Sequence, residues 1–229
     1  MPIYNPAAAI NKLDDIADVD VPSPTDGYVV YWDAATSLWK CKLISATKLI
    51  DADADTKVDV EESADEDKIR MDVKGIEAFL LSDAGRLTLA KQSYFMARRT
   101  TAQSIPQATW TKIQFNTEDV DIQGEYDSVT NFRFTAVEAG IYIVFISAGL
   151  YAPADGTRVI LDAYKNGAAC LRLCDIQVGG ATAFSPGGAS GFINLAATDY
   201  IEAFIYQSGV AKDIAASDSA NRFGVVKIA

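Results

Sequence analysis

From Trp110 onward, the chain consists of short runs of β-branched and aromatic residues, each followed by a turn signal. None of these runs continues with the roughly 3.6-residue period of a long helix, and runs of this length and composition are typical of strands. About eight strands separated by turns indicate an all-β fold, built as a two-sheet sandwich or jelly roll. The expected strands are 110–115, 132–135, 141–150, 158–165, 168–173, 192–195, 200–207 and 223–228.

The first half of the chain also predicts strands, arranged as small hairpins in series. Residues 69–73 alternate apolar with polar side chains, as in a strand with one buried face, and Gly85 supplies a turn residue. Small hairpins cannot bury enough apolar surface alone, so copies of the same chain are the expected source of further contacts. The expected strands are 28–32, 38–43, 69–73, 79–81 and 87–89, and 90–99 is expected as a short helix or bent connector.

The acidic residues are concentrated in one block. Between Asp51 and Lys68 there are nine carboxylates and two lysines, so this block carries most of the formal net charge of −11. Because a nucleic acid or an anionic bilayer would require a basic face, neither nucleic-acid binding nor membrane insertion is expected. The longest apolar run, 141–151, is about half the length of a membrane helix.

Three residues of the acidic block are candidate metal ligands. Asp51, Asp53 and Asp55 alternate along the chain, and carboxylate oxygens are the ligands that Ca²⁺ prefers. The block lacks the Gly and the terminal Glu of a helix-loop-helix calcium site, so a solvated acidic collar without a metal is the favoured interpretation.

The sequence contains no histidine. Ser-His-Asp and Cys-His nucleophiles, imidazole acid–base catalysis and His-containing zinc sites are therefore excluded. Cys41, Cys170 and Cys174 are too few for a disulfide framework and are expected as small buried thiols. The Gly-Gly pairs at 179–180 and 187–188 lack the Lys-Ser or Lys-Thr of a phosphate-binding loop. We expect a non-enzymatic protein without a cofactor.

The second half of the chain carries an ordered set of landmarks, and this set resembles the complement globular-head and tumour-necrosis-factor-like jelly rolls across residues 98–229. Asn131 stands where that family often has Gly, and Asn tolerates the left-handed backbone of such a turn. The landmarks are the Tyr-Asp to Phe-Thr stretch 126–135, the alternating stretch 140–145, the Asn-Gly turn 166–167, Asp199 and the closing run 221–228.

This resemblance implies that the chain is a homotrimer, because jelly rolls of this type pack three around an axis through an aromatic-rich strand face. Some of six aromatic side chains are therefore expected between subunits: Phe132, Phe134, Tyr142, Phe145, Phe204 and Tyr206. Without the resemblance, the six aromatic side chains in question would mostly be assigned to the core.

Two N-terminal segments resemble parts of phage appendages. Residues 55–72 look very like a segment that recurs in phage tail-fibre and other virion appendage proteins, and 13–39 is similar to short β modules of the same appendages. The resemblance implies a structural virion fibre of a tailed phage, made in the host cytoplasm and carried on the virion. The expected domains are an anchoring arm 1–12, an N-terminal β module 13–48, an acidic β shaft or linker 49–97 and a jelly-roll head 98–229.

Two regions are candidates for the contacts of such a fibre. The apolar start is either a frayed terminus or an arm that docks into capsid, portal, collar or tail proteins. The loops 151–158, 179–191 and 208–221 punctuate the strands of the head and are expected to face a glycan or protein of the host surface. The arm residues are Pro2, Ile3, Tyr4, Pro6 and Ile10, and the loop residues are Tyr151, Asp155, Arg158, Gly180, Phe184, Gly188, Lys212 and Asp218.

Three functions remain open at this stage. Host attachment by a tail or head fibre is the favoured one, and a capsid or collar decoration protein with a purely structural role is the alternative. The third is a polysaccharide-degrading spike, in which paired carboxylates would cleave a glycosidic bond. Such spikes usually form their substrate groove from many stacked repeats, and this chain has no such repeat.

Overall fold

The computed structural model describes residues 19–20, 28–43, 48–60, 63, 65–180, 189–214 and 220–229. Every regular element in these ranges is a β-strand, which confirms the predicted all-β class. The same ranges contain no helix that is long and apolar enough to cross a membrane. The chain divides into two compact units, an N-terminal unit (Met1–Thr88) and a head (Leu89–Ala229).

The N-terminal unit begins with a three-stranded sheet in the order β1-β3-β2. β2 (Tyr28–Asp33) and β3 (Leu38–Leu43) form the predicted hairpin, and β1 (Val19–Asp20) pairs with β3 in parallel. Trp32 and Trp39 are register partners in the hairpin, with ring centroids 5.5 Å apart. This cross-strand aromatic pair stabilises the hairpin.

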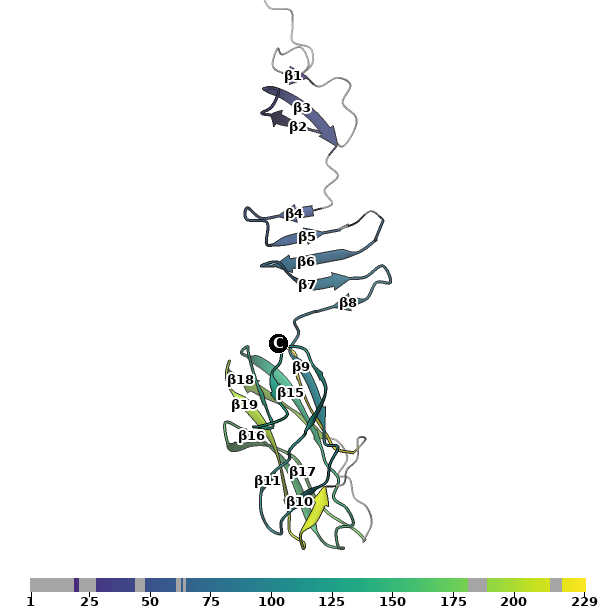
Figure 1. Ribbon diagram of the computed structural model, residues 1–229, viewed down its shortest axis with the longest axis vertical. Helices are drawn as coiled ribbons and strands as arrows, with labels where there is room; N and C mark the ends of the chain where they lie inside the picture. Colours follow the sequence, from purple (N-terminus) through teal and green to yellow (C-terminus); the bar gives the residue numbers. More distant parts are fainter. Residues whose placement is uncertain are drawn as a thin grey trace, which may run out of the picture. The chain divides into compact units, whose positions relative to one another are not determined.

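A five-stranded sheet follows, and Figure 1 shows its strands side by side in sequence order. Neighbouring strands are antiparallel throughout, so the sheet is a meander. The acidic block forms the β4–β5 turn and the β5–β6 connection of this meander. The strands are β4 (Lys48–Ile50), β5 (Lys57–Asp59), β6 (Ile69–Val73), β7 (Ile76–Leu81) and β8 (Leu87–Thr88).

The described part of the N-terminal unit has no hydrophobic core of its own. Its one buried residue is Asp59, whose carboxylate lies 2.9 Å from Lys48 Nζ and 3.9 Å from Lys57 Nζ. Large apolar side chains are instead exposed on the five-stranded sheet, as at Leu49 (68% exposed) and Ile50 (53%). A sheet of this kind requires a further surface to cover its apolar side chains.

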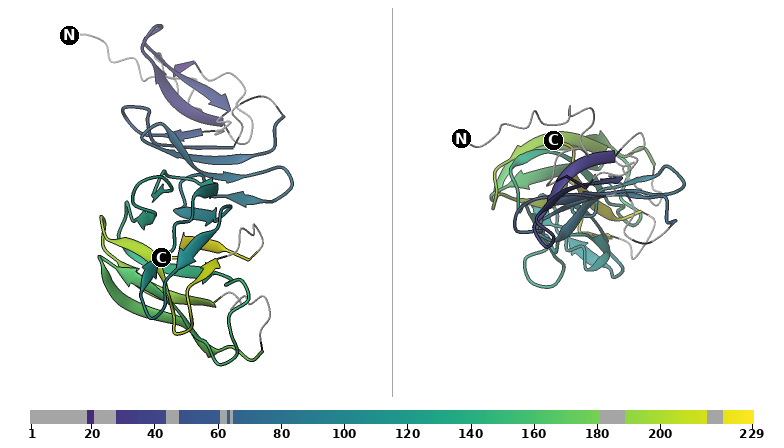
Figure 2. Two further views of the ribbon diagram at one scale, coloured as in Figure 1. Left: turned by 60° about the horizontal axis from the view of Figure 1, so that its bottom comes forward. Right: turned by 90° about the horizontal axis from the view of Figure 1, so that it is seen from above.

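The head is a sandwich of two antiparallel sheets. The first, called the β15 sheet, has the order β12-β9-β21-β15-β18, and the second, called the β19 sheet, has the order β13-β14-β19-β16-β17 with β11 also paired to β19. Figure 2 shows the two sheets from two further directions. Strands that follow one another in the chain repeatedly alternate between the sheets, which is the jelly-roll connectivity that the sequence predicts.

The strands of the β15 sheet are β9 (Tyr94–Arg98), β12 (Thr117–Asp121), β15 (Gly140–Ser147), β18 (Ala189–Leu195) and β21 (Arg222–Lys227). Those of the β19 sheet are β11 (Thr111–Lys112), β13 (Tyr126–Asp127), β14 (Arg133–Thr135), β16 (Arg158–Lys165), β17 (Ala168–Gln177) and β19 (Tyr200–Gln207). β10 (Gln103–Ile105) and β20 (Lys212–Ile214) form a separate antiparallel pair.

The core lies between the two sheets and is rich in aromatic rings. Phe95 is fully buried at its centre, with ring centroids 4.5 Å from Tyr126, 4.9 Å from Phe223 and 5.4 Å from Phe134. Every second residue of a strand points inward, and the residues between them point away from the core. The register of the core therefore also decides which side chains form the two outer faces of the sandwich.

The head begins earlier than the predicted boundary at residue 98. The segment 90–99, expected as a helix or connector, contains β9, which pairs with both β12 and β21 inside the β15 sheet. The expectation of a helix came from good helix formers in this segment, namely Met96, Ala97 and Arg98. Its alternation is nevertheless regular, because Phe95 and Ala97 are buried and their neighbours are not.

The turn between β13 and β14 differs from its prediction. Phe132 has the left-handed backbone, with φ at 49°, and Asn131 does not. Asn131 instead donates from its backbone and side chain to Asp127, which also accepts backbone N–H groups of Val129 and Thr130. The backbone N–H groups of Thr130 and Val129 lower the pKa of Asp127 to about 2. Hydrogen bonds to the Asp127 carboxylate therefore stabilise this turn, whereas the family resemblance predicted a left-handed backbone at Asn131.

We predict that Phe95→Ala destabilises the full chain by about 3–5 kcal/mol, because it removes a ring that contacts three others and leaves a cavity. Guanidinium unfolding followed by near-ultraviolet circular dichroism measures this change. The matched control is Val129→Ala, whose side chain is 81% exposed and should shift the midpoint little. Equal midpoints for both variants would contradict the assigned core.

Candidate functional site

The outer face of the β15 sheet is apolar, and we call it the apolar face. Its side chains alternate with the core residues of the same strands, and Ile143 is the register partner of both Phe192 and Val226. Phe192 is 68% exposed. The face is formed by Tyr94, Met96, Ile141, Ile143, Phe145, Phe192 and Val226.

An open hollow of about 450 Å³ lies on the apolar face. Met96 and Phe145 are among its lining residues, and Gly224, the register partner of both, lies between them with no side chain to fill the space. Charged groups stand at the edge, where Arg222 and Arg98 both bind Asp119 at 3.0 and 3.1 Å. A contiguous apolar face with a charged edge is typical of a surface that a protein partner covers.

The six aromatic residues predicted between subunits occupy four different environments. Phe134 and Tyr142 have no exposed surface and belong to the core, so they leave the set of candidates for a contact between subunits. Phe145 lies on the apolar face, and Phe132 lies in the β13–β14 turn. Phe204 and Tyr206 lie on the outer face of the β19 sheet, which points away from the apolar face. A single axis through one face therefore cannot include all six.

The strand ends that carry the three predicted loops lie at one end of the head. Strand register places Ser147 beside Arg222 and Arg158 beside Gln177, so the connections after β15, β17 and β19 leave the sandwich at the same end. Two hydrogen bonds join these connections. Tyr151 N donates to Asp213 O over 2.8 Å, and Gly180 N donates to Asp155 over 2.9 Å.

The individual loop residues do not all behave as predicted. Tyr151 is 65% exposed, and Asp155 and Gly180 are also exposed. Arg158 and Lys212 belong to strands β16 and β20, so they are not loop residues. Phe184, Gly188 and Asp218 lie outside the described residues, as do the arm residues Pro2, Ile3, Tyr4, Pro6 and Ile10.

The two cysteines of the head, Cys170 and Cys174, are not activated as nucleophiles. Cys41, Cys170 and Cys174 are free, and Cys170 is exposed although all three were expected to be buried. Burial of the thiol group raises the pKa of Cys170 and of Cys174. Both thiols are therefore protonated at neutral pH, the opposite of what nucleophilic catalysis requires.

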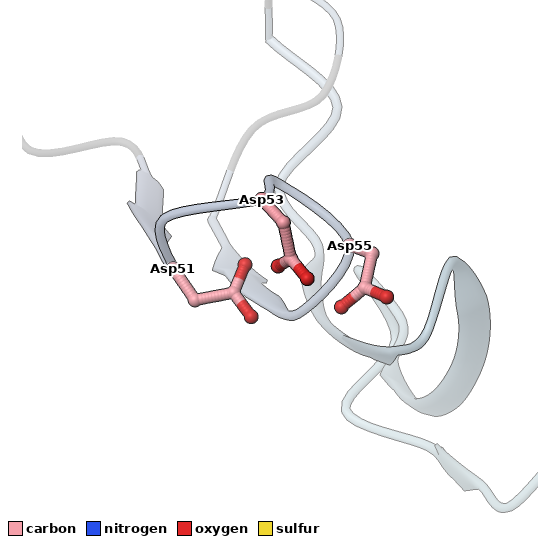
Figure 3. A group of neighbouring side chains, drawn as sticks. All are labelled: Asp51, Asp53 and Asp55. Atoms are coloured by element: carbon pink, nitrogen blue, oxygen red, sulfur yellow. The ribbon is translucent and has the colours of Figure 1, made fainter.

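The candidate metal ligands are brought together in the β4–β5 turn (Figure 3). One carboxylate oxygen from each of Asp51, Asp53 and Asp55 lies within 4.8 Å of the others. The backbone N–H of Thr56 donates to Asp51 over 3.1 Å and lowers the pKa of that carboxyl. A hard cation such as Ca²⁺ prefers such oxygens and takes about six to eight of them, so one oxygen from each of these side chains would fill only part of its coordination shell.

Comparisons with known proteins identify relatives only at the level of the fold. No protein-family model matches the sequence, and a search of curated proteins finds no match. Solved structures with similar folds include murine APRIL, at 14% identity and a TM-score of 0.46 over 60% of this chain and 100% of APRIL. The globular domain of zebrafish complement 1qA is similar at 12% identity and a TM-score of 0.45, over 61% and 98% of the two chains. Eiger TNF from S. frugiperda is similar at 10% identity and a TM-score of 0.43, over 60% and 92%.

We predict that Asp53→Asn raises the thermal stability of the protein slightly, because it removes repulsion among the three neighbouring carboxylates of a solvated acidic collar. Differential scanning calorimetry in EDTA and in about 1 mM CaCl₂, near the affinity of weak extracellular calcium sites, measures the effect. The matched control is Asp83→Asn, at an exposed turn of the same unit. Destabilisation by Asp53→Asn in calcium alone would show that the turn binds the ion.

Proposed function

We propose that the chain is a homotrimeric structural fibre of a tailed-phage virion, and that its head attaches the particle to the host cell. The apolar face of the β15 sheet is the observation that carries the proposal, because a trimer supplies the surface that would cover it. The resemblance of residues 55–72 to virion appendage segments supports the phage context. In the structure this segment forms β5, most of β6 and the connection between them.

Self-association explains the exposed apolar residues of both units. In the head, the apolar face has the composition of an interface core, with aromatic and methionine side chains at its centre and ion pairs at its edge. In the N-terminal unit, the described residues include exposed apolar side chains and no buried ones. Copies of the same chain would cover both surfaces, since a symmetric assembly repeats every contact around its axis.

Attachment follows from the arrangement of the head within such a trimer. If the apolar face turns toward the axis, the outer face of the β19 sheet and the loop end remain accessible in every copy. Three equivalent sites then act together on one cell surface, so weak single contacts become useful through multivalency. A decoration protein of the capsid or collar would share the trimer but would not bind cells.

We predict that Phe192→Asp converts the trimer into monomers in which the head stays folded. The side chain is 68% exposed in the protomer, so the carboxylate stays solvated in the monomer but would be buried in the assembly. Light scattering coupled to size-exclusion chromatography measures the mass, and circular dichroism checks the fold. Val129→Asp, at a residue that is 81% exposed in the β13–β14 turn, should remain trimeric. A wild-type monomer at micromolar concentration would reject the trimer.

We predict that purified full-length protein competes with the encoding phage for adsorption to host cells. Cells are incubated with the protein, and free phage is then titrated. Reduced adsorption by wild-type protein, and a much weaker effect of the monomeric Phe192→Asp variant, is the expected outcome. Unchanged adsorption together with heat-sensitive virions that lack the protein would support the decoration role instead.

A further inference from the structure

The outer face of the β19 sheet carries a cluster of four aromatic rings, which we call the aromatic strip. Trp110 precedes β11, Tyr164 lies on β16, and Phe204 and Tyr206 lie on β19. The Trp110 ring centroid is 5.4 Å from that of Tyr206 and 6.0 Å from that of Tyr164, and Tyr164 stacks on Phe204 at 4.0 Å. The rings form a continuous platform outside the core.

The polar atoms of the aromatic strip are available to a ligand. All four rings are half-buried, so part of each remains in contact with solvent. Among the described residues, the Trp110 indole N–H and the hydroxyls of Tyr164 and Tyr206 have no hydrogen-bond partner. Buried tyrosine and tryptophan usually bond their polar atoms within the protein. Here the same three atoms have no such bond, and each belongs to a ring that is only half-buried.

Three ion pairs lie on the same face as the aromatic strip, and the two partners of each pair differ in their exposure to solvent. Arg172 binds Asp162 at 3.1 Å, and its side chain is 50% exposed whereas that of Asp162 is 4% exposed. Arg158 binds Asp175 at 2.6 Å with exposures of 53% and 29%. Lys112 binds Glu202 at 2.5 Å, with exposures of 33% and 9%. The three cations and three carboxylates of these pairs balance in charge, but in each pair the cation is the more accessible group and is the one a ligand would meet first.

Strand register places these cations next to the rings. Asp162 is the register partner of both Arg172 and Phe204, and Lys112 is the partner of Phe204 on the other side, so the four residues form one row across the sheet. Neighbouring strands lie about 5 Å apart, so the row spans the width of a few sugar rings. Arg158 lies two residues before Ile160, the register partner of Tyr206, on the same strand.

We infer that the aromatic strip, with Arg158, Arg172 and Lys112, is a binding site for a carboxylated polysaccharide. Sugar rings present C–H groups that stack on the negative faces of aromatic rings, and their hydroxyls would bond Trp110, Tyr164 and Tyr206. Carboxylates of the polymer would take up the outward N–H groups of the guanidinium ions. This inference deepens the proposed attachment function and rests on it, since it names the class of surface molecule that the head recognises.

The site overlaps the predicted loop surface only at Arg158. Trp110 and Tyr164 were not among the sequence-predicted contact residues, and Arg158 was assigned to a loop. The net charge of the chain would repel an anionic polymer over most of its surface. Recognition of such a polymer therefore requires accessible cations, and Arg158, Arg172 and Lys112 place them beside the rings, each more exposed than its carboxylate partner.

The test measures binding of the full-length protein to three carboxylated polymers, polygalacturonate, alginate and hyaluronan, by isothermal titration calorimetry. Fully methyl-esterified polygalacturonate and dextran are the neutral comparisons. We expect binding to at least one carboxylated polymer, weaker binding as salt rises, and no binding to either neutral polymer. Absence of binding to all three carboxylated polymers, or equal binding to the neutral ones, would overturn the inference.

Two variants locate the site. Trp110→Leu removes the central ring and keeps an apolar side chain, and Arg158→Gln removes one cation while Asp175 keeps Arg172 at 3.2 Å. Each should weaken binding about tenfold, the effect of losing one stacking or charged contact. The matched controls Trp32→Leu and Arg86→Gln, in the N-terminal unit, should bind as the wild type does. Equal affinity of all four variants would place the polysaccharide elsewhere and reject this site.

The outcome is separable from that of the adsorption experiment. Competition for host cells without binding to any carboxylated polymer would reject the inference and leave host attachment standing. Polysaccharide binding that the two strip variants weaken, without competition for cells, would support the site and reject attachment as the function of the whole protein. Thermal unfolding of each variant, expected within a few degrees of the wild type, shows whether a loss of binding reflects a loss of fold.

Discussion

Close packing between the two sheets of the head is the constraint on which the other features depend. Phe95 and the rings around it fix the register of β9, β14 and β21. Because side chains alternate between the two faces of a strand, this register also determines which of the remaining side chains point outward. Once Tyr142 and Val144 face the core, Ile143 and Phe145 must face outward. The same argument on β19 places Phe204 and Tyr206 on the opposite surface. One core therefore determines two outer faces of different chemistry.

The two units of the chain depend on association to different degrees. The head has a complete core and leaves one apolar face uncovered, so its protomer can fold before it assembles. The N-terminal unit, in its described part, buries a single charged residue, Asp59, and exposes apolar side chains on a thin sheet. Its stability should therefore rise with protomer concentration, since folding and association of such a sheet are linked.

Composition and periodicity predicted the all-β class, the two hairpins of the N-terminal unit and most strands of the head, because long β-branched runs have few alternatives. They missed β9, where helix-forming residues occupy a strand that only its sheet partners reveal. They also could not sort the six aromatic residues, because alternation shows that two sets of side chains face opposite ways without showing which set is inside. Trp110 and Tyr164 come together only because strands that are distant in the sequence are neighbours in the β19 sheet, and no local sequence pattern predicts that contact. The strand ends that carry the predicted loops do lie at one end of the head, since every second turn of an antiparallel sandwich falls at the same end.

The outward side chains of β16 and β19 share their backbone with the core but none of its packing. A substitution at such a position changes what the surface presents while the inward residues keep the strand in register. Binding preference can thus diverge between related chains much faster than the fold, by single replacements among half-buried aromatic and charged residues. A protein whose binding target on another organism changes would benefit from this separation, because replacements on the outer face alter binding while the core residues keep the fold.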